Sequence, residues 1–179
     1  MKSKAFRWAA PILALLVLAG SIGALAQASS PKSLSGVMDA YTPQTTTGPY
    51  EIRGPWSLKL KGNSGTADFS AALDMELSDG WVLTKNSGNF DPNARGAHTH
   101  HVTLTGGTVT QITNGFQVSG TATITLNGGP APVSPTPLVI EITGGSDVQF
   151  SNITLTFGTP GSNHFGTEPL PGVVRCVNK

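Results

Sequence analysis

The amino-acid sequence predicts an all-β fold: a single antiparallel domain of about nine strands, forming a closed or nearly closed up-and-down barrel. Three observations predict it. Apolar and polar residues alternate along several long segments, glycine-containing turn pairs separate those segments, and no stretch after residue 28 has a convincing 3.6-residue apolar period. Strands joined by short turns must be antiparallel neighbours, so a succession of them forms a meander.

The alternation is clearest in three segments, residues 56–61, 67–77 and 116–126. Apolar or small residues occupy every second position there, and mostly serine, threonine or charged residues lie between them. Successive side chains of a strand point to opposite faces of the sheet. Each segment is therefore expected to turn one face toward the core and the other toward solvent.

Turn chemistry marks the ends of these strands. Residues 62–65 (Gly-Asn-Ser-Gly) join the first two strands, and Asp79-Gly80 sends the chain back through Trp81. Gly106-Gly107 and Asn114-Gly115 are expected to bound a further strand, residues 108–113. Such pairs supply the positive φ angles that tight hairpin turns require.

A weak internal repeat predicts two similar hairpins. The segment that starts at Val102 overlays the segment that starts at Ile140, with the same offset of 38 residues through both Gly-Gly pairs. The apolar face of the second copy consists of Leu138, Ile140 and Ile142. The matching positions in the first copy are His100, Val102 and Leu104.

A closed barrel is favoured over a two-sheet sandwich, because a barrel removes edge strands and a sandwich needs more crossing connections. Gly54-Pro55-Trp56, with Arg175 near the C-terminus, resembles the G-x-W tryptophan and late basic residue of lipocalin-type barrels. The resemblance covers four residues and implies a lipocalin-like shape that holds a small apolar ligand. Trp56 and Trp81 are the candidate ligand-binding residues, although aromatic residues on strands are more often core.

Residues 1–28 have the three zones of a cleavable secretion signal. Positive charges at Lys2, Lys4 and Arg7 precede an apolar run over residues 8–20, and A-x-A patterns end at Ala26 and Ala28. We expect cleavage after Ala28, leaving residues 29–179 as a single β domain. The protein is then exported, periplasmic or extracellular, with no transmembrane segment after cleavage. The alternative is an uncleaved N-terminal anchor.

The charge of the chain argues against binding of nucleic acid or anionic lipid, and its cysteine content excludes an intrachain disulfide. The signal holds three of the eleven basic residues and none of the ten acidic ones, so the mature net charge is 8 − 10 = −2. Such a chain has no basic field for nucleic acid or anionic lipid. The single cysteine, Cys176, excludes an intrachain disulfide.

The histidines form the candidate site. His98 and His100 stand two apart at the start of a predicted strand, so their side chains share one face, whereas His101 faces the other way. His164, in the long segment 158–172, is the third candidate ligand. Imidazole suits zinc and copper, so a zinc or copper ion is the candidate cofactor, although the sequence does not identify it. The alternatives are a metal-free polar cluster at a pocket mouth, and histidines that only pack.

Three functions remain open. The leading hypothesis is an exported binding module that holds a small ligand or a metal ion at the histidine cluster. The alternatives are a metal-dependent enzyme that uses the same histidines, and a structural or interaction protein of the cell envelope. Binding leads because the sequence contains no G-x-S-x-G, C-x-x-C, P-loop or H-E-x-x-H motif, so no catalytic residue is assigned.

Overall fold

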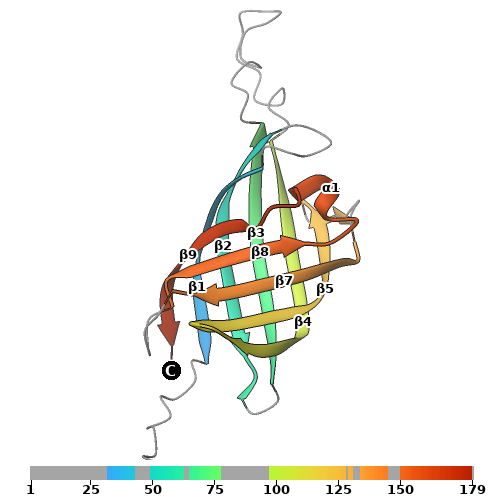
Figure 1. Cartoon of the computed structure of the whole chain (residues 1–179). Helices are drawn as coiled ribbons and strands as arrows, with labels where there is room; N and C mark the ends of the chain where they lie inside the picture. The colour runs from blue at the N-terminus through green and yellow to red at the C-terminus, as the bar shows by residue number, and fades with distance from the viewer. Residues whose placement is uncertain are drawn as a thin grey trace, which may run out of the picture.

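The described part of the chain forms nine strands and one helical turn (Figure 1). The computed structural model describes residues 32–42, 49–62, 65–77, 97–127, 129–130, 134–144 and 150–178. The strands are β1 Ser33–Thr42, β2 Tyr50–Leu60, β3 Thr66–Leu77, β4 His98–Ile112, β5 Gly115–Leu126, β6 Gly129–Pro130, β7 Thr136–Thr143, β8 Asn152–Phe157 and β9 Leu170–Asn178, and the helix is α1 Ser162–Phe165. The predicted signal, Trp81 and residues 85–96 lie outside the described residues.

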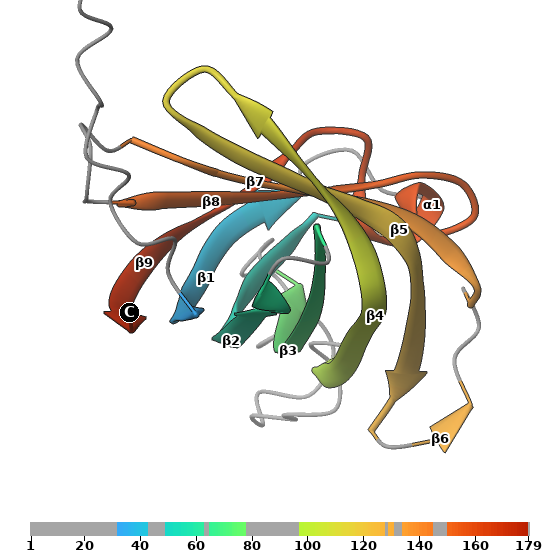
Figure 2. The same ribbon diagram turned by 90° about the horizontal axis from the view of Figure 1, so that it is seen from below.

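Eight of the strands close into a barrel. Their order around the sheet is β4-β3-β2-β1-β9-β8-β7-β5, and a β4–β5 pairing closes the ring. Every pairing is antiparallel. Figure 2 shows β1 to β5 on one side and β7 and β8 on the other, with β9 beside β1. The predicted up-and-down barrel is confirmed. The two-residue strand β6 only extends the edge of β5, so the ring has eight strands rather than nine.

The interior of the barrel is an apolar core built from the inward positions of each strand. The predicted alternation holds in β2, β3 and β5, where Trp56, Phe69 and Ile124 are buried between exposed or half-buried neighbours. It also holds in β7, whose inward positions are Leu138, Ile140 and Ile142. The solvent faces of these strands carry mostly hydroxyl and charged side chains, as the sequence pattern predicts.

The prediction of a turn at Gly106-Gly107 is wrong. Strand β4 continues through both glycines, and its register with β3 and β5 shifts between Leu104 and Thr108. Gly106 has a φ of +67°, and its N–H donates to Asp68 Oδ1 at 2.8 Å. A β-bulge uses the same positive-φ glycine as a hairpin turn, so the sequence pattern alone does not separate the two.

The two repeated segments therefore differ in structure. In the second copy, Gly144 has a φ of +93° and follows the end of β7, where Thr143 is paired with Asn152 of β8. In the first copy, the reversal comes later, at Asn114, whose φ is +60°. The prediction of a turn at Asn114-Gly115 is confirmed by the Ile112–Gly115 pairing of β4 with β5.

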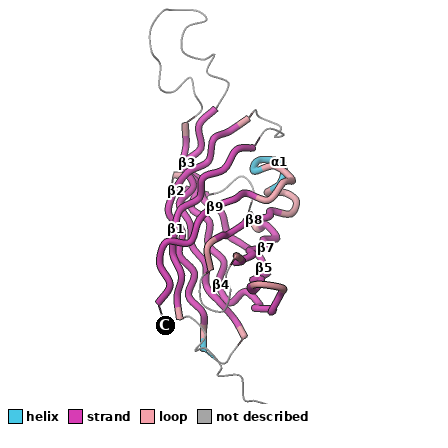
Figure 3. Tube along the Cα trace, turned by 60° about the vertical axis from the view of Figure 1, so that its left-hand side comes forward, coloured by secondary structure: helices cyan, strands magenta, loops and turns pink. Residues whose placement is uncertain are grey.

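Helix α1 is a single turn in the connection between β8 and β9, and it lies near β5 at the upper right of Figure 1. Figure 3 shows that little of the described chain is helical besides this turn. Across the parts of the chain that the structure describes, no helix is both long and apolar enough for a membrane span.

Candidate metal centre

Strand β4 places the first two histidines at one end of the barrel interior. His98 is paired with Met75 of β3, and His100 lies between Leu73 of β3 and Leu126 of β5. The His100 side chain is 1% exposed, and His98 is half-buried. His101, one residue on, is exposed on the outer wall. The predicted sharing of one face by His98 and His100, opposite to His101, is therefore confirmed.

Helix α1 brings the third histidine to the same end of the barrel. The backbone N–H groups of His164 and Phe165 both donate to the Gly161 carbonyl at 2.9 Å. The Phe165 ring is fully buried and stacks on Phe157 of β8, with ring centroids 4.3 Å apart. A side chain at Gly161 would collide with Thr136 of β7. These contacts seat the turn against the barrel and fix where His164 points.

The three imidazoles converge through their Nε2 atoms. His164 Nε2 lies 2.8 Å from His100 Nε2 and 3.1 Å from His98 Nε2. The candidate ligand nitrogens of all three residues lie within 4.8 Å of one another. Metal–nitrogen bonds of 2.0–2.1 Å in a tetrahedral site put ligand nitrogens about 3.3 Å apart. Small rotations of the rings would therefore let the cluster hold a metal ion.

Hydrogen bonding alone does not satisfy this arrangement. An imidazole nitrogen offers either one N–H or one lone pair. His164 Nε2 therefore cannot make two full hydrogen bonds to His98 and His100 at once. A metal cation would accept the Nε2 lone pairs of all three rings together.

Burial keeps two of the rings neutral. Burial, followed by the charges of His164 and His98, lowers the pKa of His100 to about 4. Burial, followed by the charge of His98, also lowers the pKa of His164 to about 4. Neutral imidazole is the form that ligates metals. At pH 7, His100 and His164 are therefore in the ligating state.

His100 also has a second ring nitrogen that needs a partner. Its buried Nδ1 makes no well-formed hydrogen bond within the described parts of the chain, although the Thr125 backbone is near enough to favour the protonated ring. Metal-bound histidines usually donate this second N–H to a carboxylate, carbonyl or water. The Thr125 backbone could serve in that way.

Aromatic rings surround the cluster. The Tyr50 ring centroid lies 5.6 Å from that of His98 and 5.7 Å from that of His164. Phe165 is 5.2 Å from His100 on the inner side. The role of Phe165 was not predicted from the sequence. The only available signal was a large apolar residue directly after the candidate ligand His164. These rings shield His100 from water. The half-buried His98 and His164 lie on the side of the cluster that is more open to solvent.

Trp56, the first predicted ligand-binding residue, lies in the barrel core and apart from the histidines. Its side chain is 3% exposed and stacks on Phe69, with ring centroids 6.4 Å apart. Its buried Nε1 has no hydrogen-bond partner among the residues that are described. Arg175, the late basic residue of the lipocalin resemblance, is exposed on β9. Ligand binding by Trp56 stays a prediction, and Trp81 lies outside the described residues.

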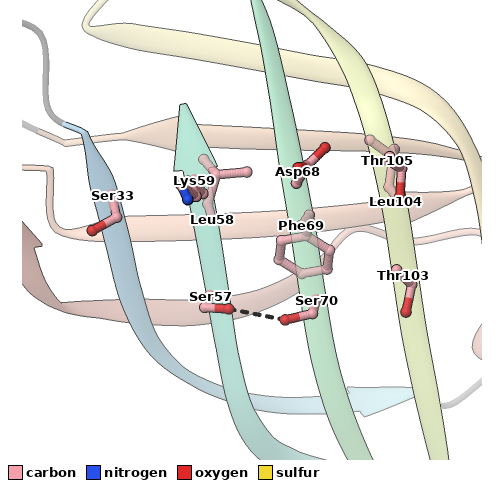
Figure 4. Close-up of a pocket in the computed structure, with 10 residues that line it drawn as sticks. All are labelled: Ser33, Ser57, Leu58, Lys59, Asp68, Phe69, Ser70, Thr103, Leu104 and Thr105. Carbon is pink, nitrogen blue, oxygen red and sulfur yellow. Dashed lines mark hydrogen bonds between the residues drawn. The ribbon is translucent and has the colours of Figure 1, made fainter. Parts of the chain in front are cut away.

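A separate hollow of about 390 Å³ lies over strands β1 to β4, and its residues include none of the histidines. Figure 4 shows the Ser57–Ser70 hydrogen bond, 2.9 Å long, along one side of it. The charged residues that line it are Lys59 and Asp68, and Asp68 forms an ion pair with Lys61 at 2.8 Å. The sequence reasoning assigned no role to this hydroxyl-rich wall.

No family model, curated protein or solved structure matches the chain. The site is therefore interpreted from its own chemistry.

Proposed function

We propose that this chain is an exported β-barrel protein that binds a divalent zinc or copper ion through His98, His100 and His164. The observation that carries the proposal is the convergence of three Nε2 atoms. His164 Nε2 lies 2.8 Å from that of His100 and 3.1 Å from that of His98, although His164 is 64 and 66 residues away from them in the chain. Export rests on the order of charge, apolar run and small residues in residues 1–28.

The chemistry of the cluster supports a metal over a metal-free polar cluster. Buried polar groups normally find hydrogen-bond partners. Here three imidazoles face one another, and within the described residues no carboxylate or thiol joins them. A polar cluster built for hydrogen bonding alone would be better served by a mixture of donors and acceptors. A set of neutral nitrogen ligands suits zinc or copper.

Metal-dependent catalysis by the same site is the alternative hypothesis. Three protein ligands leave one position of a tetrahedral ion for water or another molecule, as catalytic zinc sites do. Nothing in the geometry described above assigns a nucleophile or a general base beside the histidines. The proposal is therefore a binding function.

The metal proposal is tested on untagged protein lacking residues 1–28. Equilibrium dialysis against zinc and copper, followed by elemental analysis, should find one ion per chain. His100→Ala should lose this ion because His100 is the most deeply buried of the three candidate ligands. His101→Ala is the matched control, since it alters the adjacent, outward-facing histidine of the same strand, and it should retain the ion. Equal binding by both variants would refute the site.

Export is tested separately. Protein recovered from the periplasm or medium of an expressing bacterium should have an intact mass that begins at Ser29, or at Gln27 if cleavage follows Ala26. Retention of the whole N-terminal segment in a membrane fraction would instead support the uncleaved anchor.

A further inference from the structure

We propose that the metal-loaded centre takes a small anion as its fourth ligand. This inference deepens the proposed function and depends on it. It names the class of molecule that would occupy the coordination position left open by the three histidines. The inference is carried by the charge of the ligand set, by the burial around it and by the side from which the ion is reached.

The ligand set carries no negative charge. The cluster consists of His98, His100 and His164, and among the described residues no Asp, Glu or Cys belongs to it. Neutral imidazoles leave a divalent ion with its full double charge. Carboxylate or thiolate ligands would cancel part of that charge. An all-histidine site therefore favours an external anion more than a site with such ligands does.

Within the described part of the chain, the surroundings of the cluster offer little compensation for that charge. His100 is buried, and the rings of Tyr50 and Phe165 lie against the cluster. The carboxylate of Asp74, on the adjacent strand β3, is exposed on the outer wall and accepts a hydrogen bond from Thr99 Oγ1 at 2.7 Å. An uncompensated charge in a partly apolar setting is costly. An anion at the fourth position would lower that cost more than a neutral ligand.

Burial also indicates where the anion enters and how large it can be. His100 and Phe165 close the inner side, whereas His98 and His164 are half-buried. The fourth position should therefore face the side of His98 and His164. Tyr50 stands 5.6 and 5.7 Å from their ring centroids and narrows that approach. Anions of a few atoms, such as azide or thiocyanate, fit this description better than bulky ones.

The test uses the full mature chain loaded with cobalt(II), whose visible absorption reports changes of ligand. Titration with azide or thiocyanate should change the spectrum saturably, with the neutral ligand pyridine binding at least about tenfold more weakly because it brings no charge to the ion. The His98→Asp variant supplies a carboxylate ligand. Where this variant retains cobalt, its azide affinity should fall by about tenfold or more for the same reason.

The outcomes separate this inference from the function on which it rests. Stoichiometric cobalt whose spectrum stays unchanged at high azide and thiocyanate would overturn the anion inference alone. Equal affinity for pyridine and azide would overturn it too, because charge would then not be the cause. Failure of the wild-type chain to bind cobalt or zinc would overturn both proposals. The His101→Ala protein should match the wild type in every titration.

Discussion

His100 combines deep burial with polar atoms that the protein does not fully satisfy. Its side chain is 1% exposed, its Nε2 meets another imidazole nitrogen, and its Nδ1 has no well-formed hydrogen bond in the described structure. A buried polar group left without a partner costs about 1–3 kcal/mol. A histidine at this position is therefore unfavourable for folding unless its ring binds a partner such as a metal ion.

The lowered pKa values of His100 and His164 predict acid sensitivity of the metal-free protein. Each pKa is about 4 in the folded state and near 6.5 in the unfolded chain. Between pH 6.5 and pH 4 the unfolded state therefore binds protons that the folded state does not. The free energy of unfolding should fall as the pH drops through this window, by at most about 1.4 kcal/mol per pH unit for each histidine.

Urea unfolding of metal-free protein between pH 7.5 and pH 4 measures this slope. The His100→Leu variant should show a shallower slope, because one depressed group is gone, whereas His101→Ala should not. Stability that stays constant from pH 7 to pH 4.5 would contradict the burial of these rings.

Trp56 provides a second test at the residue scale. Trp56→Ala should reduce the free energy of unfolding by about 3–5 kcal/mol, the usual range for a large core residue. Trp56→Phe should cost far less, because it fills part of the volume and removes a buried N–H that has no partner in the described structure. Chemical denaturation of both variants decides this. A Phe variant as unstable as the Ala variant would show that Nε1 has a partner, such as an ordered water.

Four strands could be located from the sequence, whereas β1 was not located and one interruption was misread. Period-two alternation located β2, β3, β5 and β7 because each has one buried face. The length of β4 was missed because Gly106 serves a bulge and not a turn. Both features need a positive φ, and only pairing across the sheet distinguishes them.

Helix α1 was not predictable from periodicity, because its four residues are too few to show a helical period. The place of His98 and His100 on one face followed from strand geometry. The place of His164 depends on tertiary packing that no local pattern specifies, above all the stacking of Phe165 on Phe157. Its convergence with the other two was therefore a hypothesis that only the folded structure could support.

Phe165 should act as a positioning residue for the site. Phe165→Ala removes the buried ring that seats α1, so metal affinity should fall by roughly 10–100-fold, as for other supporting residues of metal sites. Phe165→Leu keeps most of the packing volume and should lose much less. Competition titration against a chromogenic zinc chelator measures both.

The exposed residue Val173 provides the control for Phe165, because Val173→Ala should leave zinc affinity unchanged. If Phe165→Ala bound zinc as tightly as the wild type, the α1 turn would not depend on this ring for its position.

For the whole molecule, barrel closure is what makes the site possible. The connection that carries α1 joins the neighbouring strands β8 and β9, yet His164 on it reaches His98 and His100 of β4. The proposed ion would then join two parts of the chain that meet only in the folded state. Composition and alternation predicted the barrel, but they carry no information on which loop covers which end.

Metal should therefore stabilise the whole barrel. An ion that binds the folded state alone raises stability by about 2.7 kcal/mol when its concentration is 100 times the dissociation constant. The melting temperature should rise with zinc, and a chelator should reverse the rise. His100→Ala should show no zinc-dependent rise, while His101→Ala behaves like the wild type. An equal rise in all three proteins would point to binding elsewhere.

The most direct measurement of the central claim is an anomalous difference map from crystals of the untagged, zinc-loaded mature chain, collected at the zinc absorption edge. The expected result is one strong peak at the end of the barrel, about 2.0–2.1 Å from the Nε2 atoms of His98, His100 and His164. A map with no peak among these three rings, or a zinc ion held by other residues, would contradict the proposed function.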